Sequence, residues 1–152
     1  MTRLQRGDVA ELTFVLPPAP GINSRHGTDP LTGQRVRLPG QYKYVPTAHG
    51  ARPVLSAYAR RWREQAALLV TVAARECGWV DPGGDLVVEL MQRGAGRRDV
   101  DAGVKLALDS VAEGLGVNDR RFRRVVLERE REGAPCLAVR VFAWAAVESG
   151  AA

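Results

Sequence analysis

The sequence predicts one compact α/β domain of the α+β type, with its elements in the order strand, long loop, helix, strand, helix, strand, strand. A length of 152 residues suits a single domain with its own core. Two stretches place apolar residues at helical spacing, and four short β-rich runs are bounded by turn-forming residues. Hydrophobic and charged contents of 45% and 26% are those of an ordinary globular protein.

The first strand is predicted at residues 9–16, where apolar and polar residues alternate loosely. The run Pro17-Pro18-Ala19-Pro20-Gly21 ends this strand. From there to residue 53 the chain is rich in proline and glycine and has no periodic apolar pattern. Loops of this length in small domains are usually functional or disordered, so we expect residues 24–53 to be a long functional or disordered loop.

The first helix is predicted at residues 54–77, with Ser56 as its N-cap and Gly78 just past its end. Its apolar stripe recurs at spacings of three and four, as on one face of a helix. The stripe consists of Leu55, Tyr58, Trp62, Ala66, Leu69 and Ala73. Three arginines in the first half of the helix lie off this stripe, where they form either a solvated face or a contact with DNA.

A turn at residues 81–84 separates this helix from a second predicted strand at residues 85–92. A second helix is predicted at residues 101–115, and Gly114 and Gly116 are expected to end it. The predicted buried face of this helix consists of Val104, Leu108, Val111 and Leu115.

The last two strands are predicted at residues 122–130 and 136–144, joined by a turn as an antiparallel hairpin. The whole chain, residues 1–152, is thus expected to form one domain. Its core should span about residues 10–144, and residues 1–8 and 149–152 should be frayed.

The chain carries a formal net charge of +5 and a sequence pI of about 9.9. This charge is compatible either with a solvated surface rich in arginine or with a polyanionic partner. Cys77 and Cys136 fit no metal-ligand spacing, and we expect both to be buried free thiols. The first residues lack the apolar core of a signal peptide, and no run approaches a membrane span. A cytoplasmic protein without a membrane partner is expected.

The stretch from residue 97 to residue 119 combines acids and bases in a pattern that suggests phosphodiester chemistry. Its members are Arg97, Arg98, Asp99, Asp101, Lys105, Asp109, Asn118 and Asp119. Hard divalent cations such as Mg²⁺ prefer carboxylate oxygens, and arginines beside such a site attract and orient phosphate. Because Asp101, Lys105 and Asp109 are spaced by four, we expect them on one face of the second helix.

Each of these residues also has a simpler structural explanation. Asp99 or Asp101 could cap the helix, and Lys105 could form an ion pair with Asp101 one turn away. Asn118 and Asp119 could belong to a turn before a strand. The convergence of all of them on one helix and its exit loop is what favours a metal site.

The pattern Arg98-Asp99-Val100-Asp101-x-x-x-Lys105-x-x-x-Asp109, closed by Asn118-Asp119, resembles the RusA family of Holliday-junction resolvases. That family carries an Asp-x-Asp-Asn-x-x-Lys motif, a further aspartate four residues on, and a later Asp-Asp. The proline-rich run from Pro17 to Asn23 resembles the family's Pro-Pro-Ser-x-Asn opening, and the similarity covers about residues 10–144. Ala102 stands where the family has asparagine, and Asn118 where it has aspartate.

The resemblance implies a crossover junction endodeoxyribonuclease, a Mg²⁺-dependent hydrolase acting in DNA recombination and repair, in which Mn²⁺ could substitute for Mg²⁺. In this interpretation Asp99, Asp101 and Asp119 hold the metal, Lys105 completes the catalytic group, and Asp109 and Asn118 have secondary roles. The residues expected to grip DNA are Asn23, Arg25, Arg97, Arg98, Arg120 and Arg121.

The expected partner is a four-way DNA junction, cut by paired nicks in the nucleoid. The resemblance also implies a homodimer, since two sites suit the two-fold symmetry of a junction. Two other interpretations stay open. The chain could be a non-catalytic protein that binds branched DNA on the same scaffold, or a basic structural or adaptor protein whose acids are caps and ion pairs.

Overall fold

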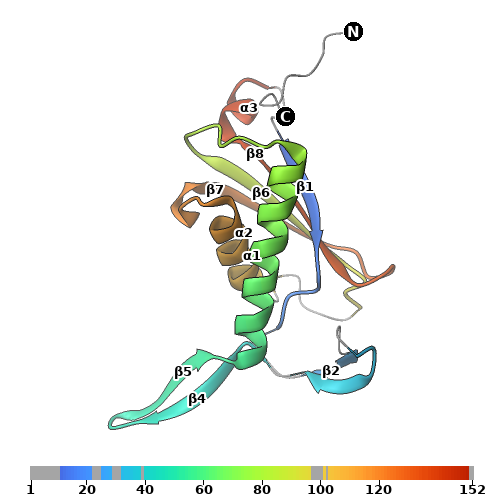
Figure 1. The fold of residues 1–152 in the computed structure, drawn as a ribbon, viewed down its shortest axis with the longest axis vertical. Coiled ribbons are helices and arrows are strands. Elements are labelled where there is room, and N and C mark those ends of the chain that lie inside the picture. Colours follow the sequence, from blue (N-terminus) through green and yellow to red (C-terminus); the bar gives the residue numbers. More distant parts are fainter. Residues whose placement is uncertain are drawn as a thin grey trace.

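One mixed sheet of four strands, covered on one face by two helices, forms the core of the chain in the computed structural model (Figure 1). The sheet order is β1 (Glu11–Leu16), β8 (Cys136–Ala143), β6 (Leu86–Arg93), β7 (Phe122–Arg129). The structure describes residues 11–21, 25–28, 32–38, 40–96, 101 and 103–150. The predicted α+β domain is confirmed, whereas the predictions for residues 1–10 and 151–152 lie outside the described residues.

The predicted hairpin between the last two strands is wrong, because β6 lies between them. β6 pairs with β8 antiparallel and with β7 parallel. Five of the eight residues of β6 are buried, as suits a strand that is paired on both sides. The β6–α2–β7 connection is the crossover that a parallel pair requires.

The segment after β7 therefore crosses the end of β6 instead of closing a hairpin. The Gly94 amide donates to the Glu132 carbonyl at 3.0 Å, and the Glu130 amide donates to the Gln92 carbonyl at 2.8 Å. Gly94 has a positive φ of 62°, and a Cβ there would lie 2.6 Å from the Gly133 carbonyl oxygen. Only glycine fits this crossing.

Helix α1 (Ala57–Cys77) begins and ends as predicted. The Ser56 hydroxyl accepts the Ala59 amide at 3.1 Å, and Gly78 adopts the left-handed conformation that closes the helix. The predicted face is partly wrong, since Leu69 is 40% exposed. The buried residues of α1 are Ala59, Trp62, Ala66, Ala67 and Val70.

Helix α2 (Val104–Leu115) packs against α1 through small residues. Gly114 was expected to end α2 but lies inside it, where a Cβ would be 2.5 Å from the Ala67 carbonyl oxygen of α1. The Thr71 hydroxyl of α1 lies 2.9 Å from the Gly114 carbonyl oxygen, so the backbones touch. The buried residues of α2 are Leu106, Ala107, Ser110, Val111 and Ala112. Val111 alone of the predicted face is fully buried.

The segment predicted as a long loop contains two antiparallel hairpins. They are formed by β2 (Arg25–Thr28) with β3 (Arg35–Leu38), and by β4 (Tyr42–Thr47) with β5 (Gly50–Leu55). Both hairpins project from the same end of the molecule, beside the first turn of α1 (Figure 1). Because the β4–β5 strands are exposed along most of their length, they carry no hydrophobic alternation that would reveal them in the sequence.

Two short helices complete the structure. The 3₁₀ helix η1 (Asp119–Arg121) precedes β7, and α3 (Trp144–Glu148) follows β8, so that Trp144 is helical and not part of a strand. Cys77 is exposed and Cys136 is half-buried, and both are free thiols, so the prediction of buried thiols is wrong for Cys77. Within the described part of the chain, no helix is long and apolar enough to cross a membrane.

Candidate active site

An ammonium group between two carboxylates marks the site that the structure brings together. Lys105 on the first turn of α2 lies with its Nζ 2.7 Å from Oδ1 of Asp109, one turn further along the helix. The same Nζ lies 3.9 Å from Oδ2 of Asp119 at the start of η1. Helix and exit loop thus meet at one cation.

The turn after α2 explains why Asp119 reaches back to the first half of the helix. Gly116 takes the left-handed conformation, and the Val117 amide donates to the Ala112 carbonyl at 3.0 Å. This closing turn reverses the chain, which then runs along α2. The resulting hollow of about 330 Å³ is lined by Arg63, Asp109, Ala112, Glu113, Val117, Asn118 and Asp119.

The environment of Lys105 keeps its ammonium charged. Its pKa lies above 10.5, chiefly because the ammonium donates a hydrogen bond to Asp109, with the charges of Asp109 and Asp119 adding to the effect. A lysine with a raised pKa cannot accept a proton near neutral pH. Lys105 can therefore act as a fixed positive charge and not as a general base.

Tyr42, at the start of β4, adds to the raised pKa of Lys105 as the smallest of its causes. The residue lies in the segment predicted as a loop, and no pattern in the sequence pairs it with the second helix.

Asp101 does not cap α2 and does not pair with Lys105, so neither of the simpler structural explanations considered for it holds. It lies exposed in the turn before the helix, whose N-cap is Gly103, and its carbonyl oxygen accepts the Val104 amide at 3.2 Å. Since α2 begins at Val104, the prediction that Asp101 shares a helical face with Lys105 is wrong. The i,i+4 ion pair of Lys105 is made with Asp109 instead.

Several predicted site residues fall outside the part of the chain that can be described. These residues are Asn23, Arg97, Arg98, Asp99 and Ala102. For Arg25 the structure describes only the backbone, in β2. Asn118 has the structural role considered for it, because its Oδ1 accepts the Arg120 amide at 3.0 Å and so caps η1.

The two arginines of η1 differ in what they contact. Arg121 makes a two-pronged contact with Asp81, at 2.7 and 2.6 Å, and also donates to the Gly84 carbonyl at 2.7 Å. These bonds tie the turn after α1 to η1. Arg120 is exposed and adjacent to Asp119 in the sequence, so it remains the better of the two for binding phosphate.

The Asp81–Arg121 pair predicts a measurable pH dependence of stability. The Arg121 guanidinium, helped by the Gly83 amide, lowers the pKa of Asp81 from 3.8 to about 2. A carboxylate with a lowered pKa stabilises the fold above its unfolded pKa, and the contribution disappears as the pH falls through the folded value. Wild type should therefore exceed Asp81→Asn in stability above pH 3.8, and the two should converge near pH 2.

The difference should be below about 1 kcal/mol, because both side chains are partly exposed to solvent. Urea unfolding at a series of pH values measures it. A difference that stays constant from about pH 5 down to pH 2 would show that the pair does not titrate as described.

The donors at this site are carboxylate oxygens, which suit a hard divalent cation such as Mg²⁺. Within the described ranges, no group of three or more histidine, cysteine, aspartate or glutamate residues is arranged to hold a metal ion. The predicted set needs Asp99 in addition to Asp101 and Asp119, and Asp99 lies outside those ranges. The metal site therefore stays a prediction.

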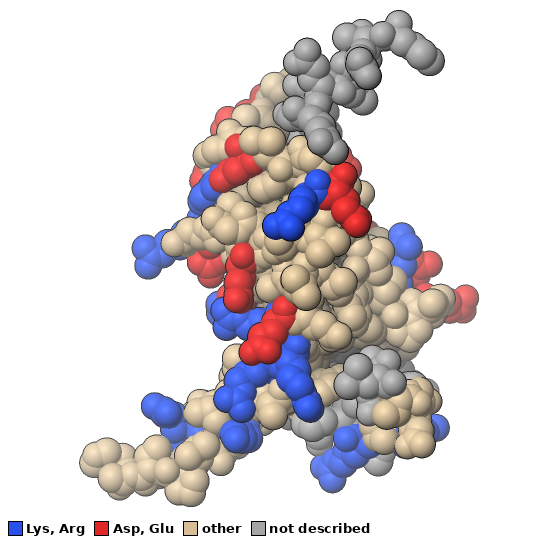
Figure 2. Space-filling view, in the orientation of Figure 1, with Lys and Arg blue, Asp and Glu red and all other residues tan. Residues whose placement is uncertain are grey.

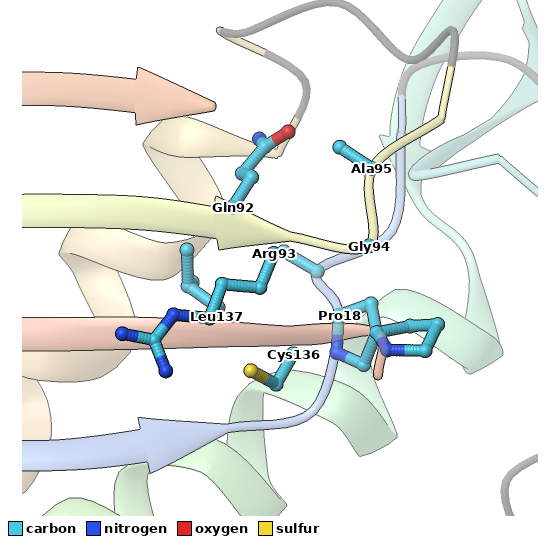
Figure 3. A pocket seen from close by; sticks show the side chains of 9 residues that line it. Pro18, Gln92, Arg93, Gly94, Ala95, Cys136 and Leu137 are labelled. Carbon is cyan, nitrogen blue, oxygen red and sulfur yellow. The ribbon is translucent and has the colours of Figure 1, made fainter. Parts of the chain in front are cut away.

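A second cavity, at the end of β6, is too small for a substrate. It has a volume of about 70 Å³, room for about two water molecules, and is lined by Pro18, Gly94 and Cys136 among others (Figure 3).

No protein-family model matches the chain, and no curated protein matches it.

Proposed function

We propose that the protein is a Mg²⁺-dependent endonuclease that cuts branched DNA, most specifically four-way junctions, by paired nicks. The observation that carries the proposal is the meeting of Lys105, Asp109 and Asp119 at one place, within the sequence pattern that resembles the resolvases. Such an enzyme would act on nucleoid DNA in recombination and repair.

Each acidic and basic residue has a distinct task in this proposal. Asp99, Asp101 and Asp119 would hold the Mg²⁺, which supplies Lewis-acid stabilisation to the scissile phosphate. Lys105 stabilises negative charge that develops on the phosphate. Asp109 holds the Lys105 ammonium in place through its 2.7 Å contact and so acts as a positioning residue.

The distribution of charge supports a DNA substrate more than the net charge does. Between Leu12 and Arg63 the chain has eight lysines and arginines and one carboxylate, Asp29. Among the described residues, Figure 2 shows basic and no acidic side chains over the hairpins and the first turns of α1, whereas acids are mixed with bases over the rest of that face. Such a separation gives one end of the molecule affinity for a phosphate backbone.

The homodimer remains part of the proposal, since a junction offers two equivalent phosphates. The large aromatic residues Trp62 of α1 and Phe142 of β8 are buried within the chain and are not available for an interface. Leu68, Leu69 and Val72 are exposed on the outer side of α1 and are better candidates for an apolar contact between two copies.

Lys105→Ala is expected to lower the single-turnover cleavage rate about 100-fold, because a fixed charge aimed at the phosphate is lost. The junction Kd should change much less, since other basic residues hold the DNA. Lys105→Arg, which keeps a charge, should restore part of the rate. If Lys105 serves only in a surface ion pair, the rate will not change, and stability will shift by a few tenths of a kcal/mol.

A comparison of a four-way junction with a linear duplex of the same sequence tests the proposed substrate. Preferential binding and cutting of the junction support the proposal. Preferential binding without cutting supports a non-catalytic protein on the same scaffold, and equal weak binding to both DNAs contradicts a junction-specific role.

A further inference from the structure

The β4–β5 hairpin is an exposed ribbon, and packing within the core does not account for its presence. All side chains from Tyr42 to Pro53 are exposed, including Tyr44 at 72% and Val45 at 37%. In Figure 1 the ribbon extends away from the sheet and helices and returns to the chain at α1. Exposed aromatic residues on a projecting element indicate a binding role.

The two faces of the ribbon differ in chemistry. Side chains alternate between the faces of a strand, and residues opposite each other in the pairing share a face. Tyr44 is opposite Pro53 and shares a face with Tyr42, which forms an aromatic face. Lys43 is opposite Val54, and Val45 is opposite Arg52, which forms a basic face.

The charge around the ribbon favours a polyanion as its partner. From residue 30 to residue 63 the chain has no aspartate or glutamate. Lys43 and Arg52 flank the middle of the ribbon, and the exposed Arg60 and Arg61 of α1 follow its base. The tip, by contrast, has no lysine, arginine, aspartate or glutamate (Figure 2). The positively charged lower part of the ribbon suits contact with phosphates, and the tip suits contact with the nucleobases beyond them.

The ribbon is long and stiffened along its length. The six residues of β4 span roughly 20 Å at about 3.3 Å per residue. The Thr47 hydroxyl donates to the Gly50 carbonyl at 2.7 Å across the turn, and Pro46 and Pro53 restrict the backbone. The turn and the prolines thus stiffen the arm.

We propose that the β4–β5 ribbon inserts into branched DNA, with Tyr44 stacking on a base at the branch point and Lys43 and Arg52 contacting the flanking phosphates. This inference rests on the proposed function, because it takes branched DNA as the substrate. Bases at a branch point are more easily unstacked than those within a duplex, so an aromatic side chain there distinguishes a junction from linear DNA.

Fluorescence of 2-aminopurine placed at the branch point of a synthetic junction tests the insertion, in EDTA so that no cutting occurs. Wild type should raise the fluorescence severalfold. Tyr44→Ala should lose most of this increase and weaken junction binding about tenfold, with a smaller effect on linear duplex. Tyr44→Phe keeps the ring and should behave as wild type. Val80→Ala, at a residue 59% exposed and outside the ribbon, is the matched control.

Equal fluorescence and equal affinity for wild type and Tyr44→Ala would overturn the insertion, even if the enzyme still cuts junctions with Mg²⁺. Insertion without any cutting would instead overturn the proposed catalysis alone. A variant in which residues 45–52 are replaced by Asn-Gly tests the alternative that the ribbon holds two copies of the chain together as a dimer. Conversion of a dimer to a monomer in that variant, measured by sedimentation, would also overturn the inference.

Discussion

Asp119→Asn is expected to lower junction cleavage in Mg²⁺ by at least about 100-fold while the affinity for the junction is retained. The substitution keeps the size of the side chain and removes one charge from the proposed ligand set and from the surroundings of Lys105. Loss of a carboxylate ligand weakens the binding of the metal ion, whereas the binding of DNA depends on the basic end of the molecule. Asp101→Asn and Asp99→Asn should have the same effect.

Glu113→Gln provides the matched control. Glu113 lines the same hollow, is 53% exposed, and pairs with Arg63 at 3.1 Å, but it has no task in the proposed chemistry. Single-turnover rates measured with saturating enzyme separate the loss of chemistry from the loss of binding. Full activity of Asp119→Asn would remove Asp119 from the catalytic group.

Gly114→Ala is expected to destabilise the fold by about 1–3 kcal/mol. Helix propensity alone predicts the opposite sign, because alanine is favoured over glycine within a helix by about 1 kcal/mol. A Cβ at Gly114, however, would lie 2.5 Å from both the Ala67 carbonyl oxygen and the Val70 Cβ, so α1 and α2 would have to separate. The sign of the change therefore decides between the two effects.

Urea unfolding of Gly114→Ala measures this change, with Glu113→Ala on the exposed side of α2 as the control. The control should lose only the surface ion pair with Arg63, worth less than about 1 kcal/mol. A stabilised Gly114→Ala protein would contradict the close packing of the two helices.

Elements with local signals could be predicted from the sequence. Ser56 and Gly78 set the ends of α1 through bonds that involve only neighbouring residues, and the four strands of the sheet follow from short apolar runs. The predicted buried face of α1 is partly wrong, and the error has a physical cause. A stripe of large residues indicates a core, but α1 meets α2 through Ala67 and Gly114, whose small size allows close approach and exposes Leu69.

Strand pairing and the exposed hairpins could not be predicted in the same way. The position of β6 between β7 and β8 depends on contacts between distant parts of the chain, and adjacency in the sequence favours the wrong hairpin. The β4–β5 ribbon buries little, so its sequence has no reason to alternate. Its prolines are tolerated because each strand of a two-stranded ribbon is an edge.

In the candidate site, too, the local contact could be predicted from the sequence and the long-range contact could not. The spacing of Lys105 and Asp109 predicts their contact, since residues four apart meet on a helix. The approach of Asp119 to Lys105 depends on the turn at Gly116. This geometry has no local signature in the sequence.

Cleavage of a synthetic four-way junction by wild-type protein shows whether the protein is a junction resolvase. The reaction is followed in single-turnover conditions over a range of Mg²⁺ concentrations. Strand-specific labels report which strands are nicked. Cutting should require Mg²⁺, stop in EDTA, and yield nicks on two opposed strands. A junction that stays bound and intact at saturating Mg²⁺, or cutting that continues in EDTA, would contradict the proposed function.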